Sequence, residues 1–129
     1  MKEFTTTITP RLYETDALGH INNATIAAWF EVARMRFLES LADPGQGNFL
    51  DWILASLQID FVSETFYGTD VVASIVDARV GNTSLTVSCQ MSQDGQLTVR
   101  GKAVLVYMDI ENKSPRRIPD ILREKISDL

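Results

Sequence analysis

The residues best suited to chemistry lie in one stretch, residues 13–34, which reads YETDALGHINNATIAAWFEVAR. Asp16 lies seven residues before Asn23, and Gly19 lets the backbone turn sharply between them. The first amides of a helix have no partner within it, and its N-terminus carries partial positive charge, so these amides can donate to an oxyanion forming on a carbonyl. A carboxylate aimed at the same point makes a minimal acyl-transfer site, in which Asp16 attacks a carbonyl or deprotonates a water.

The same stretch also has simpler structural interpretations, and composition cannot choose between them. Asn22 and Asn23 are typical helix-capping residues, and an aspartate such as Asp16 often forms the turn before a helix. His20 is the only histidine, and a lone histidine is usually a structural hydrogen-bonding group. No serine–histidine–acid triad can be assembled around it, and with one histidine and one cysteine we expect no metal site.

The composition limits the class of protein. The chain has 129 residues, enough to bury a core as a single domain, residues 1–129, without disulfides or metals. Its one cysteine, Cys89, excludes an intrachain disulfide and suits a cytoplasmic setting. The chain has no long apolar run and no signal-peptide apolar region, so we expect no membrane span. Its net charge is -5, so we do not expect it to bind nucleic acid.

A helix is predicted to follow the polar segment, from the paired asparagines to about Ala42. Its apolar residues recur every three or four positions, at Ile26, Trp29, Phe30, Ala33, Phe37 and Leu41. Glu31 and Arg34 form an i, i+3 pair on its more polar side, and Asp-Pro-Gly at residues 43–45 ends it. Before the segment, the threonine-rich residues 4–13 predict a strand.

The rest of the chain predicts β structure. Four apolar or alternating runs are expected to be strands, at residues 53–61, 71–80, 85–91 and 97–107. The first of these is expected to bury its odd-numbered residues, and Asp94-Gly95 predicts a hairpin turn. Pro119 and Asp120 open a short amphipathic helix. The order favours an α+β fold, in which an antiparallel sheet wraps the helix with one face and presents the other to solvent or a subunit contact.

Taken together, residues 13–34 resemble the signature of hotdog-fold acyl-CoA thioesterases of the 4-hydroxybenzoyl-CoA thioesterase type. That family carries an aspartate, a glycine three residues later, often His-Val/Ile-Asn-Asn, and a helix ending Phe-Glu-x-Ala-Arg. The matching residues are Asp16, Gly19, His20, Ile21, Asn22, Asn23, Phe30, Glu31, Ala33 and Arg34. The turn GNTS at residues 81–84 and the strand and tail VLVYMDIENKSPRRIP extend the resemblance over nearly the whole chain.

The resemblance implies a fold and a reaction. The fold is a hotdog, an antiparallel sheet of five or six strands around one long central helix, here with a short C-terminal helix. The assembly is a homodimer or homotetramer with active sites between subunits, and the substrate is an acyl-CoA, with no cofactor. Asp16 then hydrolyses the thioester as nucleophile or general base, the backbone amide of Asn23 polarises its carbonyl, and His20 positions the loop or the substrate.

Further residues are candidates for substrate contact. Gly19 and Asn22 adjoin Asp16 and Asn23, and Ile26 stands where many relatives carry a tyrosine, so that it lines or narrows the acyl pocket. Three residues in or beside the Gly81 turn are candidates for contact with CoA phosphate or pantetheine, although ordinary turn chemistry also explains them: Arg79, Thr83 and Ser84.

Three other functions stay open. The chain could hydrolyse acyl thioesters of an acidic carrier protein that docks on Lys113, Arg116 and Arg117, although the same cluster could equally meet CoA phosphates. It could bind acyl-CoA without turnover, or act as a hydratase or dehydratase on the same fold. The sequence does not indicate the acyl chain.

Overall fold

The computed structural model describes residues 1–42 and 51–129, so the predicted helix stop at residues 43–45 lies outside the described part of the chain. The elements in chain order are β1 (Phe4–Ile8), the 3-10 helix η1 (Leu12–Glu14), α1 (Asn23–Leu41), β2 (Trp52–Phe61), β3 (Val71–Val80), β4 (Ser84–Gln93), β5 (Gln96–Asp109), β6 (Ser114–Pro115) and α2 (Asp120–Ser127). The predicted long helix, the later strands and the C-terminal helix are all confirmed.

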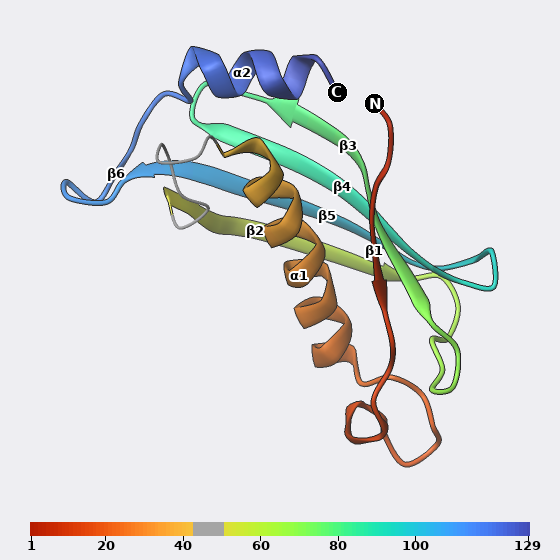
Figure 1. Cartoon of the computed structure of the whole chain (residues 1–129). Helices are drawn as coiled ribbons and strands as arrows, with labels where there is room; N and C mark the ends of the chain where they lie inside the picture. Colours follow the sequence, from red (N-terminus) through yellow and green to blue (C-terminus); the bar gives the residue numbers. More distant parts are fainter. Residues whose placement is uncertain (43–50) are drawn as a thin grey trace.

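One antiparallel sheet carries the fold. Its order is β1-β3-β4-β5-β2, and the short β6 pairs with β5. The long helix α1 lies across one face of this sheet, and α2 lies near the end of the sheet that is remote from the start of α1 (Figure 1). This arrangement is the predicted hotdog fold, with the sheet curving around α1.

The predicted apolar stripe of α1 is buried. All six of its residues belong to one hydrophobic core, together with the inward residues of β3, β4 and β5. Gly101 of β5 is needed at the centre of that core, because a Cβ there would meet the Cys89 sulfur at 2.7 Å and the Phe30 ring at 3.0 Å. A side chain at this position would therefore overlap with the side chains of the core.

Strand β1 is shorter than predicted. It ends at Ile8, and the residues before the polar segment form the short helix η1 instead of more strand. Pro10 explains the break, because proline has no amide hydrogen to donate to a neighbouring strand. The chain therefore leaves the sheet before it reaches Asp16.

The predicted burial of β2 is wrong in its first half and at its last residue. A bulge between Leu54 and Ser56 shifts the register of β2 against β5. Before the bulge, Trp52 and Leu54 lie on the α1 side of the sheet. After the bulge, Leu57 and Ile59 lie on that side. Ile53 and Phe61, both expected to be buried, are 48% and 53% exposed. Strict alternation in the sequence could not reveal the extra residue that changes the face.

The placement of Arg34 on the polar side of α1 is also wrong. Arg34 is only 4% exposed, whereas Glu31 one turn earlier is exposed. The Arg34 side chain lines a cavity between α1 and β2, so its guanidinium lies inside the fold and not at the surface. The two residues therefore do not form a simple surface pair.

Candidate functional site

The polar segment before α1 folds into a small closed loop. The amide of Asn22 donates to the carbonyl of Glu14 at 2.9 Å, Thr15 and Ile21 form a β-bridge, and the amide of Asp16 donates to the carbonyl of His20 at 2.8 Å. Gly19 closes the tip with a φ of +80°, a conformation that costs other residues energy. The predicted glycine turn is present, and it holds Asp16 across from the residues that lead into the helix.

The carboxylate of Asp16 is exposed but oriented. Its Oδ1 accepts the amides of Leu18 at 3.0 Å and His20 at 3.2 Å. Within residues 1–42 and 51–129, no group donates to its Oδ2. One oxygen thus fixes the carboxylate in the loop, while the other is left for an external partner.

The start of α1 is partly capped. Asn22 is the N-cap, and its side chain accepts the amide of Ala24 at 2.8 Å. The first hydrogen bond of the helix runs from the amide of Ile26 to the backbone carbonyl of Asn22, at 3.1 Å. Among the described residues the amide of Asn23 has no acceptor, so it is available to an external oxygen.

The side chain of His20 ties the loop to the segment after β2. Its Nε2 lies 3.2 Å from Glu64 Oε2, and its ring meets the Phe66 ring edge-on with centroids 4.9 Å apart. The backbones of His20 and Phe66 also form a β-bridge. These contacts give His20 a positioning geometry for the loop.

The segment that holds His20 is itself anchored to the sheet. Gln93, at the end of β4, donates to the carbonyls of Phe66 at 2.7 Å and Thr69 at 2.9 Å and accepts the amide of Phe66 at 2.9 Å. The amide of Tyr67 donates to the carbonyl of Gly19 at 3.2 Å. The Asp16 loop is thus linked, through this segment, to a central strand.

A second carboxylate, Glu14, was missed by the sequence analysis. It is 8% exposed, its Oε2 accepts the indole N–H of Trp29 at 2.9 Å, and its Oε1 accepts the amide of Arg11 at 2.7 Å. It joins η1 to the second turn of α1 from a position just before the loop. The only sequence signal was a glutamate fifteen residues before a tryptophan in the apolar stripe.

The structure does not bring the other predicted contact residues to this loop within one chain. The turn with Thr83 and Ser84 lies beside α2, where Arg123 donates to the carbonyl of Gly81 at 2.7 Å, at the opposite end of the sheet (Figure 1). Arg79 pairs with Asp77 at 3.0 Å. Ile26 is 1% exposed and belongs to the core.

The predicted basic docking cluster is largely engaged. Arg116 donates to the Tyr107 hydroxyl at 2.6 Å and lies over its ring, 4.4 Å from the centroid. Arg117 pairs with Asp120 at 2.8 Å, which holds the pKa of that carboxyl below its usual range. Lys113, the third predicted cation, makes no side-chain hydrogen bond, ion pair or ring contact among the described residues.

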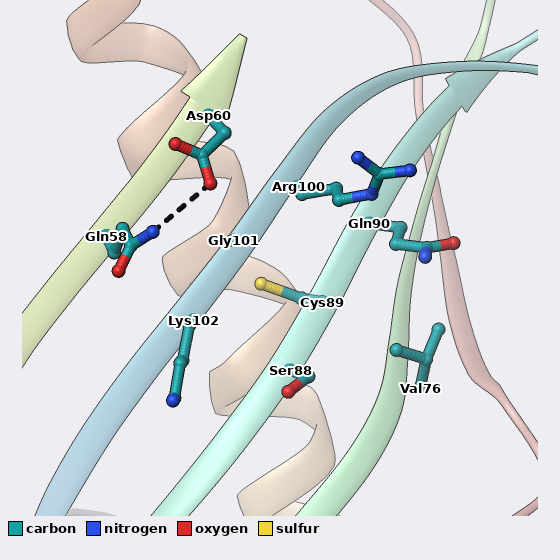
Figure 2. A pocket seen from close by; sticks show the side chains of 9 residues that line it. All are labelled: Gln58, Asp60, Val76, Ser88, Cys89, Gln90, Arg100, Gly101 and Lys102. Carbon is teal, nitrogen blue, oxygen red and sulfur yellow. Dashed lines mark hydrogen bonds between the residues drawn. The ribbon is translucent and has the colours of Figure 1, made fainter. Parts of the chain in front are cut away.

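A shallow groove of about 240 Å³ lies on the sheet face away from α1. Polar side chains of β2, β4 and β5 line it, including Asp60, Ser88 and Arg100, with α1 behind the strands (Figure 2). None of the predicted site residues lines it. Cys89 borders it from the core side, and burial raises the pKa of that thiol to about 12.

Two broader features are absent from residues 1–42 and 51–129. No helix there is long and apolar enough to cross a membrane. No three histidine, cysteine, aspartate or glutamate side chains gather there closely enough to hold a metal ion.

Comparisons with known proteins agree on one family. Residues 10–126 match the thioesterase-like superfamily. A structure described as a predicted thioesterase from Bacillus stearothermophilus superposes with a TM-score of 0.89 at 36% identity, over 98% of this chain and 96% of that one. A thioesterase from Thermus thermophilus, complexed with coenzyme A and Zn, gives a TM-score of 0.86 at 24% identity, over 96% and 91%.

A curated relative also matches most of the chain. The uncharacterised protein YsmA of Bacillus subtilis (strain 168) is 26% identical over 106 residues, which are 81% of this chain and 72% of that protein. The resemblance seen in residues 13–34 is confirmed at the level of the superfamily. From the match over residues 10–126 and the shared fold, this chain belongs to the thioesterase-like superfamily.

Proposed function

We propose that this protein is an acyl-CoA thioesterase that hydrolyses a thioester to the free acid and CoA. Asp16 acts as nucleophile or general base, and the amide of Asn23 donates to the oxyanion that forms on the thioester carbonyl. The observation that carries the proposal is the state of Asp16 in a loop closed onto the start of α1: two amides donate to Oδ1, and no group of the described residues donates to Oδ2. Such a carboxylate needs little reorganisation before it attacks.

The remaining residues of the loop support these two groups. Gly19 provides the turn that folds Asp16 back. The Asn22 side chain accepts the amide of Ala24, and the amide of Asn23 has no acceptor in the part of the chain that the structure describes. His20, held by Glu64 and Phe66, acts as a positioning residue for the loop. Relatives described as thioesterases, one of them complexed with coenzyme A, favour a CoA thioester as substrate.

The proposal includes a homo-oligomer, a dimer or tetramer, with each active site between subunits. Arg79, Thr83 and Ser84 lie at the other end of the sheet from Asp16, so they can contact the same substrate only from another copy of the chain. One cysteine with no disulfide suits the cytoplasm as the setting.

Acyl-CoA is preferred over a carrier protein because the net charge of -5 opposes the docking of an acidic protein surface. Arg117 is already paired with Asp120, whereas Arg116, which contacts the neutral hydroxyl and ring of Tyr107, keeps its positive charge.

A thiol-release screen tests the proposal. The protein is assayed against acyl-CoAs of varied chain length and aromaticity, and against the same acyl groups on a carrier protein. We expect kcat/KM to be higher for at least one CoA thioester than for its carrier-protein counterpart. Tight acyl-CoA binding in calorimetry with no thiol release would instead establish a non-catalytic binding protein.

A further inference from the structure

Arg34 is the most anomalous charged residue of the described chain. It is 4% exposed, and no group in residues 1–42 and 51–129 accepts a hydrogen bond from its buried Nη1. A guanidinium stays charged at neutral pH, and burying a charge without an acceptor is costly. The orphaned donor therefore points to an acceptor that comes from outside this chain.

The ionisable neighbours of Arg34 do not supply that acceptor. Two groups act on its charge, Cys89 and Glu31. Burial raises the pKa of the Cys89 thiol to about 12, so this thiol is neutral near pH 7. Glu31 is exposed and forms no ion pair with Arg34 among the described residues. Because water screens the charge of Glu31, the buried guanidinium keeps an unused donor.

Arg34 lines a cavity of about 230 Å³ between α1 and β2. Apart from Arg34 and Glu31, the described residues that line it are apolar and come from α1, β2 and β5: Met35, Leu38, Trp52, Leu54 and Leu105. An apolar cavity of about 150 Å³ holds a benzene molecule, so this one has room for a ring or a chain of about six to eight carbons. An orphaned cation in an apolar cavity indicates a ligand with one anionic end and an apolar body.

We propose that this cavity binds a carboxylic acid, with its carboxylate on the guanidinium of Arg34 and an apolar body of about six to eight carbons against Trp52 and Leu54. A carboxylate fits better than a phosphate, because one buried cation neutralises one negative charge. The planar fork of the guanidinium also matches the two oxygens of a carboxylate. The inference goes beyond the proposed hydrolysis and does not require it.

A carboxylate can reach Arg34 from two sources, as a free acid or as the far end of an acyl group whose thioester lies at Asn23 of the same chain. Arg34 lies eleven residues beyond Asn23, which places it about 16 Å further along the helix axis. An acyl group small enough for the cavity is too short to join the two positions. The structure therefore favours a free acid, which is also the class of product that thioester hydrolysis releases.

Calorimetric titration with hexanoate and benzoate tests the proposal, with hexanamide, benzamide and sodium chloride as comparison ligands. Each amide keeps the size of its acid without the charge, and chloride keeps the charge without the apolar body. We expect at least one of the two acids to bind once per chain, at least about tenfold more tightly than its amide and than chloride. Equal binding of the acid and either comparison ligand would overturn the assignment, and so would a wild type that binds neither acid.

Arg34→Met removes the cation and keeps an unbranched apolar side chain. It should weaken binding of the acid at least about tenfold and leave binding of the amide unchanged. Arg36→Met is the matched control, because Arg36 is an exposed arginine on the same helix, and it should bind the acid like the wild type. If Arg34→Met does not fold, Leu54→Trp decides, since it fills the cavity and leaves Arg34 in place. Unchanged binding of the acid in the deciding variant contradicts the proposal.

Asp16→Asn separates the cavity from the proposed active site. Asp16 does not line the cavity, so this variant should bind the acid like the wild type. Loss of binding here would place the acid at Asp16 and overturn the proposal. An Arg34-dependent preference for dodecanedioyl-CoA over dodecanoyl-CoA in thiol release would also overturn it, by assigning the carboxylate to the far end of an acyl group. A protein that hydrolyses acyl-CoA and binds neither acid refutes only this inference, whereas one that binds the acid without hydrolysis refutes only the proposed function.

Discussion

The hydrogen bond between Glu14 and Trp29 offers a direct test of how the loop is held. Replacing Glu14 by Gln keeps the size of the side chain but leaves one oxygen where there were two. The new amide group must then face either the indole N–H of Trp29 or the amide of Arg11, and both are donors. One charge-assisted hydrogen bond is lost and a buried donor is left without an acceptor.

The expected cost follows from the burial of this group. A hydrogen bond to a charged acceptor contributes about 1.5–3 kcal/mol, and Glu14 is 8% exposed, so solvent compensates little. We expect Glu14→Gln to lower the free energy of unfolding by about 2–3 kcal/mol. For a chain of this size that corresponds to a Tm lower by roughly 6–15 °C. Activity should fall as well, mainly in kcat, because the Asp16 loop begins at the next residues.

Thermal unfolding at matched protein concentrations measures the effect, since oligomerisation makes Tm depend on concentration. Glu3→Gln is the control, because Glu3 is an exposed carboxylate, and its Tm should be unchanged. Trp29→Phe and the double variant complete a cycle, in which we expect a coupling free energy of about 1–2 kcal/mol. A Glu14→Gln protein that melts within about 1 °C of the wild type would refute the reasoning.

Three further predictions follow from the core and the helix start. Gly101→Ala should lower the free energy of unfolding by about 2 kcal/mol or more through contact with the Cys89 sulfur, and Cys89→Ala should restore part of it in denaturant titrations. Because the pKa of Cys89 is raised to about 12, its thiol should stay unreactive toward a disulfide reagent at about pH 8 and react only on unfolding; rapid labelling of the native protein argues against this. Asn22→Ala should cost about 1 kcal/mol by uncapping Ala24, with Thr at the same position retaining most of the stability.

Much of the fold could be predicted from sequence because its signals are local and regular. The stripe of α1 has helical spacing, the residues of β4 and β5 alternate, and Asp94-Gly95 forms its hairpin with positive φ at both positions. These patterns depend on neighbours a few residues away. Such neighbours determine the backbone conformation directly.

The errors arose where long side chains or single-residue shifts decide the outcome. The bulge near Ala55 changed which residues of β2 face α1, and the Arg34 side chain is buried at a cavity between α1 and β2 instead of lying at the surface. Glu14 was overlooked because its partner, Trp29, lies on another element. No spacing rule reports a contact that depends on how two elements pack.

The loop was predicted in composition but not in geometry. The sequence indicated that Asp16, Gly19 and Asn22 share a turn before a helix, and they do. It could not reveal that Oδ1 of Asp16 is occupied by two amides, or that His20 turns to Glu64. Both features depend on how the backbone closes and on segments that meet only in the folded chain.

The central claim, that the Asp16 carboxylate performs the hydrolysis, is tested most directly by the kcat/KM of Asp16→Asn with the best acyl-CoA from the screen. Asparagine keeps an acceptor oxygen for the amides of Leu18 and His20, so the loop should stay closed while the nucleophile or base is lost. Asp128→Asn, an exposed carboxylate at the end of α2, is the control. We predict a loss of at least about 100-fold for Asp16→Asn with an unchanged Tm and no loss for the control. An Asp16→Asn protein that hydrolyses the thioester within about twofold of the wild-type rate would contradict the account.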